Sequence, residues 1–267
     1  MSGQTSILSN KDERGVLTLT LNRPELHNAF DDALIAELTR ELLNANRDES
    51  VKIVILTGAG KSFSAGGDLN WMRSMAAFDE AENIEDALAL AEMLSVLNGL
   101  DKPTIAKVNG HAFGGGVGLL ACCDIAIAVD HAKMALTEVR LGLIPAVISP
   151  YVIAAIGPRQ ARRLFLTAQA IDAPDARSCG LIHLCCSAGQ LDQAVEKQVG
   201  MLLKGGPQAL TACKTLISEV SQAGQDGATH LKRRTAEIIA QLRVSAEGQE
   251  GLSAFLEKRP ARWDTEE

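Results

Sequence analysis

Residues 109–118 read Asn-Gly-His-Ala-Phe-Gly-Gly-Gly-Val-Gly and directly follow Thr104–Val108, an apolar run that is typical of a buried strand. A second segment of small residues, 62–69 (Ser-Phe-Ser-Ala-Gly-Gly-Asp-Leu), follows Val51–Leu56, whose β-branched residues also predict a strand. Glycine lets ligand atoms approach the backbone closely, and a turn that opens a helix presents free N–H groups. Two such turns that face each other can hold one oxyanion from both sides. Either segment by itself is more typical of a tight turn with only a structural role, because glycine-rich turns are common.

Outward from these two segments, strand and helix patterns alternate, which predicts an α/β core. Leu17–Leu21 alternates apolar and small polar residues, as a half-buried strand does, and Asp124–Val129 is a further expected strand. Apolar residues recur at helical spacing over 29–47 and again over Glu80–Leu100. Later helices are expected at 168–183, 191–203, 207–223 and 229–242. We therefore predict an α/β core over residues 1–200 and a helical C-terminal region over residues 201–267.

Composition limits the classes of protein to which this 267-residue chain can belong. The formal charge of -7 argues against a nucleic-acid partner, because nucleic-acid binders usually carry a basic face. No apolar run reaches the roughly 18 residues that span a bilayer, and the first residues lack the order of a signal peptide. We therefore expect no membrane partner and a cytoplasmic location. The six cysteines have neither zinc-site nor disulfide spacing, so no metal is expected and the thiols are predicted to be reduced and buried.

Three nucleotide-binding or acyl-transfer motifs nearly match but each fails at one position. Residues 57–62 (Thr-Gly-Ala-Gly-Lys-Ser) end with the Gly-Lys-Ser of a phosphate-binding loop. That loop needs its first glycine at position 55, where this chain has Ile55. The dinucleotide motif that begins at Gly114 would need glycine in place of Leu119. A serine-hydrolase elbow would need glycine in place of Ser64. These failures argue against ATP, NAD and acyl-serine chemistry.

The two glycine segments together, in this order and spacing, are far more specific than either alone. Nearly the whole chain resembles the enoyl-CoA hydratase/isomerase family, also called the crotonase family. The residues that carry the resemblance are 21–30 (LNRPELHNAF), 63–69, 107–116, 123–126 (CDIA), 136–145 (LTEVRLGLIP) and 247–259. The resemblance implies a spiral of ββα units with a helical C-terminal trimerisation region. It also implies an acyl-coenzyme A thioester as substrate, no cofactor beyond the coenzyme A that the substrate carries, and a homotrimer or homohexamer.

The resemblance also implies functional residues, position by position. The backbone amides of Ala65 and Gly115 are the expected oxyanion donors, and Glu138 is the expected acid–base residue. The residues expected to bind coenzyme A are Leu26, His27, Ala65, Gly66, Gly67, Asp68, Leu69 and Gly115, together with Phe255 and Lys258 from the C-terminal region.

The local sequence supports a proton-transfer role for Glu138. Residues 133–137 are biased toward apolar types, and Leu141–Pro145 is apolar as well. A carboxyl group in apolar surroundings tends to have a raised pKa and can carry protons near neutral pH. Without the resemblance, the same pattern is equally typical of a surface glutamate at a strand end. His111, a second candidate base, has no partner motif and is expected to be structural.

Gly118 is the main departure from the family's pattern. Two-glutamate hydratases of the family carry glutamate at this position, whereas members with glutamate only at the Glu138 position include double-bond isomerases. Gly118 is expected to leave open space beside Cβ, which suits a branched acyl group and an isomerase substrate equally well. Residues 119–124 and 140–151 resemble bacterial methylglutaconyl-CoA and isohexenylglutaconyl-CoA hydratase-like members. The sequence therefore predicts a hydro-lyase that adds water to a 2-enoyl-CoA. A Δ3–Δ2 enoyl-CoA isomerase and a catalytically silent binding protein are the alternatives.

Overall fold

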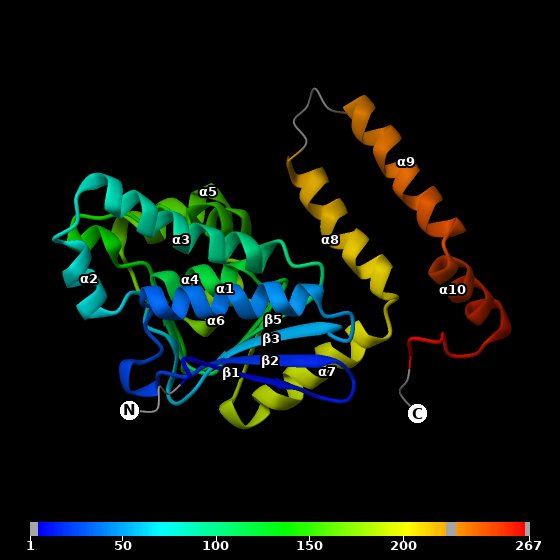
Figure 1. Cartoon of the computed structure of the whole chain (residues 1–267), viewed down its shortest axis with the longest axis horizontal. Coiled ribbons are helices and arrows are strands. Elements are labelled where there is room, and N and C mark those ends of the chain that lie inside the picture. Colours follow the sequence, from blue (N-terminus) through cyan, green and yellow to red (C-terminus); the bar gives the residue numbers. More distant parts are fainter. Residues whose placement is uncertain (1–4, 223–227, 265–267) are drawn as a thin grey trace. The chain divides into compact units, whose positions relative to one another are not determined.

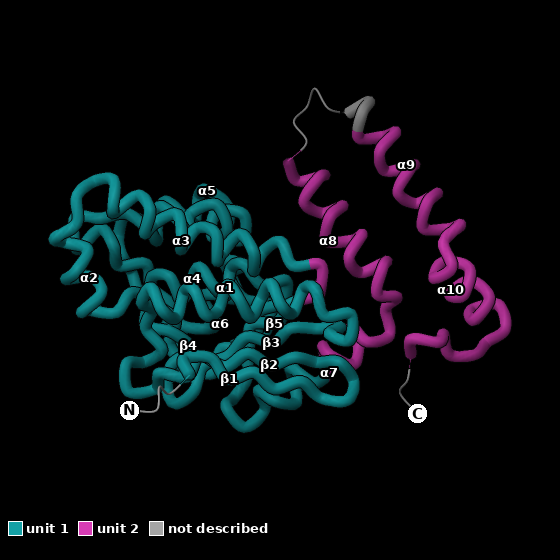
Figure 2. Tube along the Cα trace, viewed as in Figure 1, with its two compact units in different colours: residues 1–100, 104–196 teal, residues 101–103, 197–267 magenta. Residues whose placement is uncertain are grey.

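The computed structural model describes residues 5–222 and 228–264, and the chain divides into two compact units (Figure 2). The first unit comprises residues 1–100 and 104–196 and contains both sheets. The second comprises residues 101–103 and 197–267, and the elements described in it are helices. In the described ranges, no helix is both long enough and apolar enough to cross a membrane.

The first unit is built on two sheets (Figure 1). The larger sheet has the strand order β1-β2-β3-β5-β7-β10, antiparallel between β1 and β2 and parallel elsewhere. The smaller sheet has the order β4-β6-β8-β9, and β4, β6 and β8 are parallel. The larger sheet contains β1 (Ile7–Lys11), β2 (Val16–Leu21), β3 (Ile53–Gly58), β5 (Thr104–Val108), β7 (Ile125–Val129) and β10 (Leu184–Cys186). The smaller contains β4 (Ser62–Ser64), β6 (His111–Phe113), β8 (Lys133–Ala135) and β9 (Ile171–Asp172).

The chain visits the two sheets in turn, and this order positions the candidate site. Each of the pairs β3–β4, β5–β6 and β7–β8 places its first strand in the larger sheet and its second in the smaller one. Because β4, β6 and β8 are parallel neighbours, the segments that follow them leave the sheet at the same edge. Those segments are Ala65–Asp68, Gly114–Gly115 and Leu136–Glu138.

Helices cover the sheets of the first unit. Figure 1 shows α1 (Asp32–Arg47) and α3 (Glu80–Asn98) side by side over the larger sheet, where α1 buries an aliphatic stripe that includes Leu34 and Leu38. The short α4 (Gly115–Cys122) has no charged residue and is almost entirely buried. The remaining helices of this unit are α2 (Leu69–Met75), α5 (Ser149–Thr167) and α6 (Ala173–Ser178), with 3₁₀ turns η1 (Pro24–Leu26), η2 (Glu138–Leu141) and η3 (Ala188–Gln190). The helix α7 (Leu191–Leu203) begins in the first unit and ends in the second.

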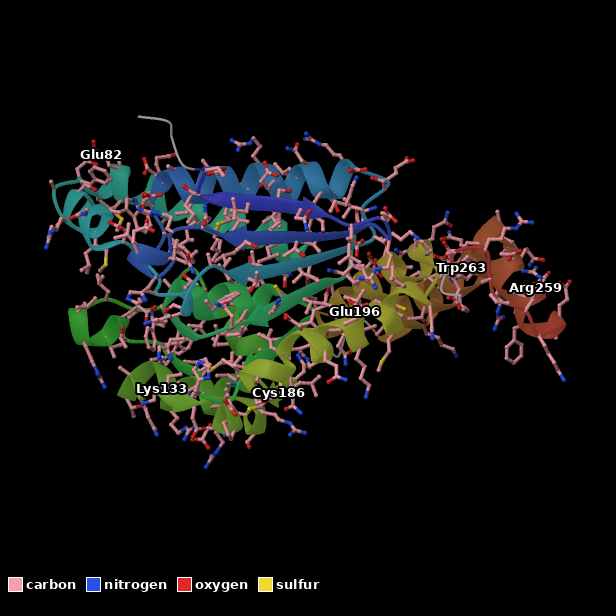
Figure 3. All side chains as sticks on the ribbon, turned by 90° about the horizontal axis from the view of Figure 1, so that it is seen from below. Glu82, Lys133, Cys186, Glu196, Arg259 and Trp263 are labelled. Atoms are coloured by element: carbon pink, nitrogen blue, oxygen red, sulfur yellow. The ribbon has the colours of Figure 1, made fainter. Side chains whose placement is uncertain are left out.

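The second unit contains α8 (Pro207–Gln222), α9 (Ala228–Val244) and α10 (Ala246–Glu257). The carboxylate of Glu247 on α10 accepts the N–H groups of Gln208 and Ala209, each at 2.9 Å, and so caps the start of α8. Figure 3 labels Arg259 and Trp263 near the end of the chain. The Arg259 guanidinium lies 2.7 Å from the Glu250 carboxylate, and Trp263 donates its indole N–H to the Lys204 carbonyl at 3.2 Å.

The α/β prediction is confirmed, and Thr104–Val108 forms a strand with the expected bounds. The helix predicted over 168–183 is wrong, because only Ala173–Ser178 is helical. Asp172 caps that short helix with its side chain, and Gly180 follows it with a φ of +88° in the left-handed region. The sequence reasoning also missed α5 and the short strands of the smaller sheet, which have two or three residues each.

Arg23 ties the starts of two helices together. Its guanidinium lies 2.8 Å from the carboxylate of Asp31 and 3.5 Å from that of Asp68, and it donates to the Ala29 carbonyl at 2.9 Å. Asp31 caps α1, and Asp68 caps α2 by accepting the N–H groups of Asn70 and Trp71. Asp68 is 6% exposed, so its charge depends on these partners for its solvation. The start of α2, just after Ala65–Gly67, is thereby held to the start of α1.

Replacing Arg23 with methionine leaves two carboxylates without their shared cation. We expect Arg23→Met to lower the free energy of unfolding by about 3 kcal/mol, at the lower end of the range for breaking a buried ion pair. The matched control is Arg40→Met on the exposed face of α1, which should change the free energy by less than about 0.5 kcal/mol. Urea denaturation of both variants measures the difference, and equal effects would contradict the assigned role.

Candidate active site

The two glycine segments of the sequence lie against each other. Gly66 has a φ of +84°, which favours glycine, and follows β4, while Gly115 follows β6. A methyl group added at Gly66 would lie 2.9 Å from the Phe113 carbonyl oxygen and 3.4 Å from the Gly115 nitrogen. The two turns are therefore in backbone contact.

The prediction that Ala65 supplies an oxyanion donor needs correction. The Ala65 N–H donates to the His27 carbonyl at 2.9 Å, so this amide is already engaged within the fold. The next amide, that of Gly66, donates to the Ser64 hydroxyl at 3.2 Å. Gly67 forms a parallel bridge with Phe30 that uses the N–H groups of Phe30 and Asp68. The Gly67 N–H takes no part in that bridge, and no acceptor for it is found among the described residues.

Gly115 has an equally unengaged amide. It is the first residue of α4, so its N–H has no acceptor within the helix, and the described ranges offer it none elsewhere. A methyl group added at Gly115 would lie 2.5 Å from a ring carbon of Phe30, which leaves no room for a side chain. Each of the two touching turns therefore presents an unengaged N–H group, that of Gly67 in one and that of Gly115 in the other. This pair, rather than Ala65 and Gly115, is available to an oxyanion.

The Glu138 carboxyl group lies beside these turns. Glu138 begins η2, and its Oε1 is 3.3 Å from the point where a Cβ at Gly114 would lie. Gly114 itself has a φ of +48°, and its N–H donates to the Ala135 carbonyl at the end of β8. The other oxygen, Oε2, is buried, and the described part of the chain gives it no hydrogen-bond partner. Burial raises the pKa of the Glu138 carboxyl above its ordinary value, as suits a proton carrier.

The expected open space at Gly118 is not there. A methyl group added at Gly118 would lie only 2.3 Å from Cγ2 and 2.9 Å from Cβ of Ile148. Ile148 is 3% exposed and precedes α5. The prediction that glycine here makes room for a branched acyl group is therefore wrong. The position also cannot hold a second carboxylate while Ile148 keeps its place.

The other predicted ligand-binding residues fall into two groups. Leu26 and Leu69 are exposed apolar residues. The Nδ1 atom of His27 and the Ser62 hydroxyl form a hydrogen bond of 3.0 Å. All three belong to the first unit, close in sequence to Arg23 or to Gly67. Phe255, which is 82% exposed on α10, and Lys258, the left-handed C-cap of that helix, belong to the second unit. Their role in binding stays a prediction.

Two residues that sequence reasoning missed line the turn at Gly67. The point where a Cβ at Gly67 would lie is 3.4 Å from Met72 Cγ and 3.5 Å from Trp71 Cζ3. The Trp71 indole N–H donates to the Asp86 carboxylate of α3 at 3.2 Å, which fixes the ring. His111 has the expected structural role, because its Nδ1 accepts the Lys133 backbone N–H at 3.1 Å.

Comparison with known proteins identifies the family to which this arrangement belongs. The sequence pattern of the family described as enoyl-CoA hydratase/isomerase matches residues 11–266. This chain belongs to that family. A crotonyl-CoA hydratase of Syntrophomonas wolfei is 33% identical, with 97% of each chain covered. A trans-2-decenoyl-[acyl-carrier-protein] isomerase of Streptococcus mutans is 29% identical, with 95% of each chain covered.

Solved structures of the enoyl-CoA hydratase/isomerase family show the same fold. The crystal structure of an enoyl-CoA hydratase from Shewanella pealeana has a TM-score of 0.92 and 44% identity to this chain, covering 97% of this chain and 96% of that one. The predicted crotonase-like fold is thereby confirmed, and the chain is an enzyme of this family. The methylglutaconyl-CoA subgroup stays a prediction.

The raised pKa of Glu138 predicts how stability depends on pH. The folded state holds this proton more tightly than the unfolded chain, so the contribution of Glu138 to the free energy of unfolding is full below the unfolded pKa. That contribution is lost as the pH rises through the folded pKa. Glu138→Gln removes the effect, and we expect the variant to gain stability relative to wild type as the pH rises above the ordinary pKa of a glutamate. Urea denaturation at several pH values measures this difference.

Glu250 provides a control of opposite sign. Its hydrogen bond with Arg259 lowers the pKa of the Glu250 carboxyl. Glu250→Gln should therefore be less stable than wild type at neutral pH, and the difference should shrink as the pH falls into the acid range. A stability difference for Glu138→Gln that stays flat over the whole range would contradict the raised pKa.

The Gly67 amide can be tested by a pair of substitutions. Gly67→Pro removes the N–H, whereas Gly67→Ala keeps it and adds a methyl group at ordinary contact distance from Met72. We expect the proline variant to lose about 10²- to 10³-fold in kcat on a short 2-enoyl-CoA, and the alanine variant to stay near wild type. Loss of the conjugated-thioester absorbance follows the reaction. Similar rates for two folded variants would exclude the Gly67 amide as a donor.

Proposed function

We propose that this enzyme adds water to a 2-enoyl-CoA, with Glu138 as the protein's single proton carrier. The observation that carries the proposal is the position of the Glu138 carboxyl, beside Gly114 and with one buried oxygen that has no partner among the described residues. The free N–H groups of Gly67 and Gly115 supply the second requirement, a place for the thioester oxygen. The similarity to a crotonyl-CoA hydratase supports the same reaction.

The proposed reaction runs through one enolate. The water oxygen forms a bond to Cβ while the Glu138 carboxylate accepts a proton from that water. The electrons of the Cα–Cβ double bond form a new double bond between Cα and the thioester carbon, and the carbonyl π electrons move onto the thioester oxygen. The N–H groups of Gly67 and Gly115 stabilise the negative charge there. Glu138 then returns a proton to Cα, which restores the carboxylate and yields the 3-hydroxyacyl thioester.

The acyl group proposed for the substrate rests on sequence resemblance. Residues 119–124 and 140–151 support a methylglutaconyl- or isohexenylglutaconyl-type acyl chain. The space at Gly118 no longer supports a branched chain, because Ile148 fills it. The substrate class is therefore proposed from these two segments alone.

A homotrimer or homohexamer is also part of the proposal. Large apolar side chains on all three helices of the second unit are exposed, and water is an unfavourable surrounding for them. We propose that further copies of this chain bury these apolar side chains. These side chains are Ile217, Val220, Ile239, Val244, Leu252, Phe255 and Leu256.

Isomerisation of a 3-enoyl-CoA is the second candidate function. It requires only that one group move a proton between Cγ and Cα, and a site with one carboxyl meets that requirement. The contact between Gly118 and Ile148, which excludes a second carboxylate, is the observation that favours it. The named isomerase among the relatives supports it as well.

Glu138→Gln tests both functions, because it keeps the shape of the side chain and removes the proton acceptor. We expect kcat to fall about 10²- to 10⁴-fold. Reaction of the wild-type enzyme in heavy-oxygen water separates the two functions, since hydration places solvent oxygen on Cβ and isomerisation adds none. Mass spectrometry of the product measures this. A folded Glu138→Gln variant with wild-type turnover would remove Glu138 from the mechanism.

A further inference from the structure

The Ile148 side chain packs in a fixed position against the backbone of Gly118 in α4. The turn that leads to it is closed by hydrogen bonds from the Ser149 N–H to the Ala146 carbonyl at 3.1 Å and from the Val152 N–H to the Ile148 carbonyl at 3.1 Å. A β-branched side chain has few accessible rotamers. Leu94 of α3 lies 3.7 Å from the same point, where a Cβ at Gly118 would be. The Ile148 side chain therefore occupies a fixed place at Gly118.

That place is one helical turn from the Glu138 carboxyl. Residues four apart are neighbours on a helix, and one turn rises about 5.4 Å. The Glu138 carboxyl lies at Gly114, the N-cap of α4, and Ile148 lies at Gly118, four residues further along. The Gly118 N–H donates to the Gly114 carbonyl at 3.3 Å, so a first-turn hydrogen bond of α4 joins the two positions, while Gly114 itself has the non-helical φ of +48°.

We propose that Ile148 determines which acyl groups the enzyme accepts, by forming the wall that limits the size of the substituents on Cβ. The inference rests on the proposed role of Glu138. Proton transfer places Cα within hydrogen-bond reach of that carboxyl, so the next carbon of the chain lies toward the following turn of α4. Because Gly118 has no side chain, the hydrocarbon of Ile148 is what lies against this turn.

The test measures binding rather than turnover. Dissociation constants of butanoyl-CoA and 3,3-dimethylbutanoyl-CoA, determined by calorimetry, give a ratio that reports the space around Cβ. Ile148→Ala removes three carbons and should shift this ratio at least 10-fold toward the bulkier thioester, the effect expected for about one methylene of space in a hydrophobic pocket. Ile148→Val, a milder change that protects against misfolding, should shift it in the same direction by less. Affinity for coenzyme A alone should not change.

The matched control is Ile156→Ala, which removes the same atoms from a buried residue two turns along α5. It should leave the ratio within twofold of wild type. The inference is overturned if folded Ile148→Ala and Ile148→Val keep the wild-type ratio, if Ile156→Ala shifts the ratio as much, or if wild type binds neither thioester. Neither saturated thioester has the double bond on which hydration acts. Failure of the proposed hydration would therefore leave the ratio measurable, and the two failures are distinguishable.

Discussion

The approach of two backbone turns without intervening side chains is the constraint on which the candidate site depends. A methyl group at Gly116 would lie 2.6 Å from the Ser64 carbonyl oxygen, and one at Gly66 would lie 2.9 Å from the Phe113 carbonyl oxygen. The ring of Phe30 likewise leaves no room for a side chain at Gly115. The positions of the two free N–H groups are therefore set by main-chain packing, which cannot adjust as a flexible side chain can. Preorganised donors of this kind stabilise a developing charge without reorganisation during the reaction.

Buried carboxyl groups serve two opposite purposes around these turns. Asp68 is fully engaged, by two N–H groups of α2 and by Arg23, and so fixes the chain that follows Gly67. Glu138 has one buried oxygen without a partner in the described structure, and burial raises its pKa. A satisfied carboxylate stabilises a fold, whereas an unsatisfied one is costly and is typical of a functional site. The contrast indicates a structural role for Asp68 and supports the proposed proton transfer by Glu138.

The sequence predicted the parts of the fold whose signals are local. The long β-branched runs and the amphipathic helix α1 are recognisable from spacing alone, and the paired glycine segments lie in two turns that touch in the fold. The three-residue strands of the smaller sheet are too short to show any period, and α5 was missed because Gly157 and Pro158 interrupt it. Such elements are defined by their neighbours in space.

The errors at the site have a similar cause. The choice of Ala65 as a donor failed because the acceptor of its N–H, the His27 carbonyl, is remote in sequence. The space expected at Gly118 is filled by Ile148, thirty positions further along the chain, and no spacing rule relates the two residues. The sequence could show where a side chain was missing. Only the fold shows which other side chain takes its place.

The contact between Gly118 and Ile148 also constrains the order in which this site can evolve. Any residue other than glycine at 118 meets the Ile148 side chain at 2.3 Å, so a first mutation at 118 is penalised while Ile148 is present. A first mutation at 148 to a smaller residue leaves a cavity but no clash, and it makes the second change tolerable. The two positions are therefore epistatic, and of the two possible orders of substitution the accessible one begins at 148. A lineage that acquires a side chain on this turn of α4 is expected to have lost its isoleucine first.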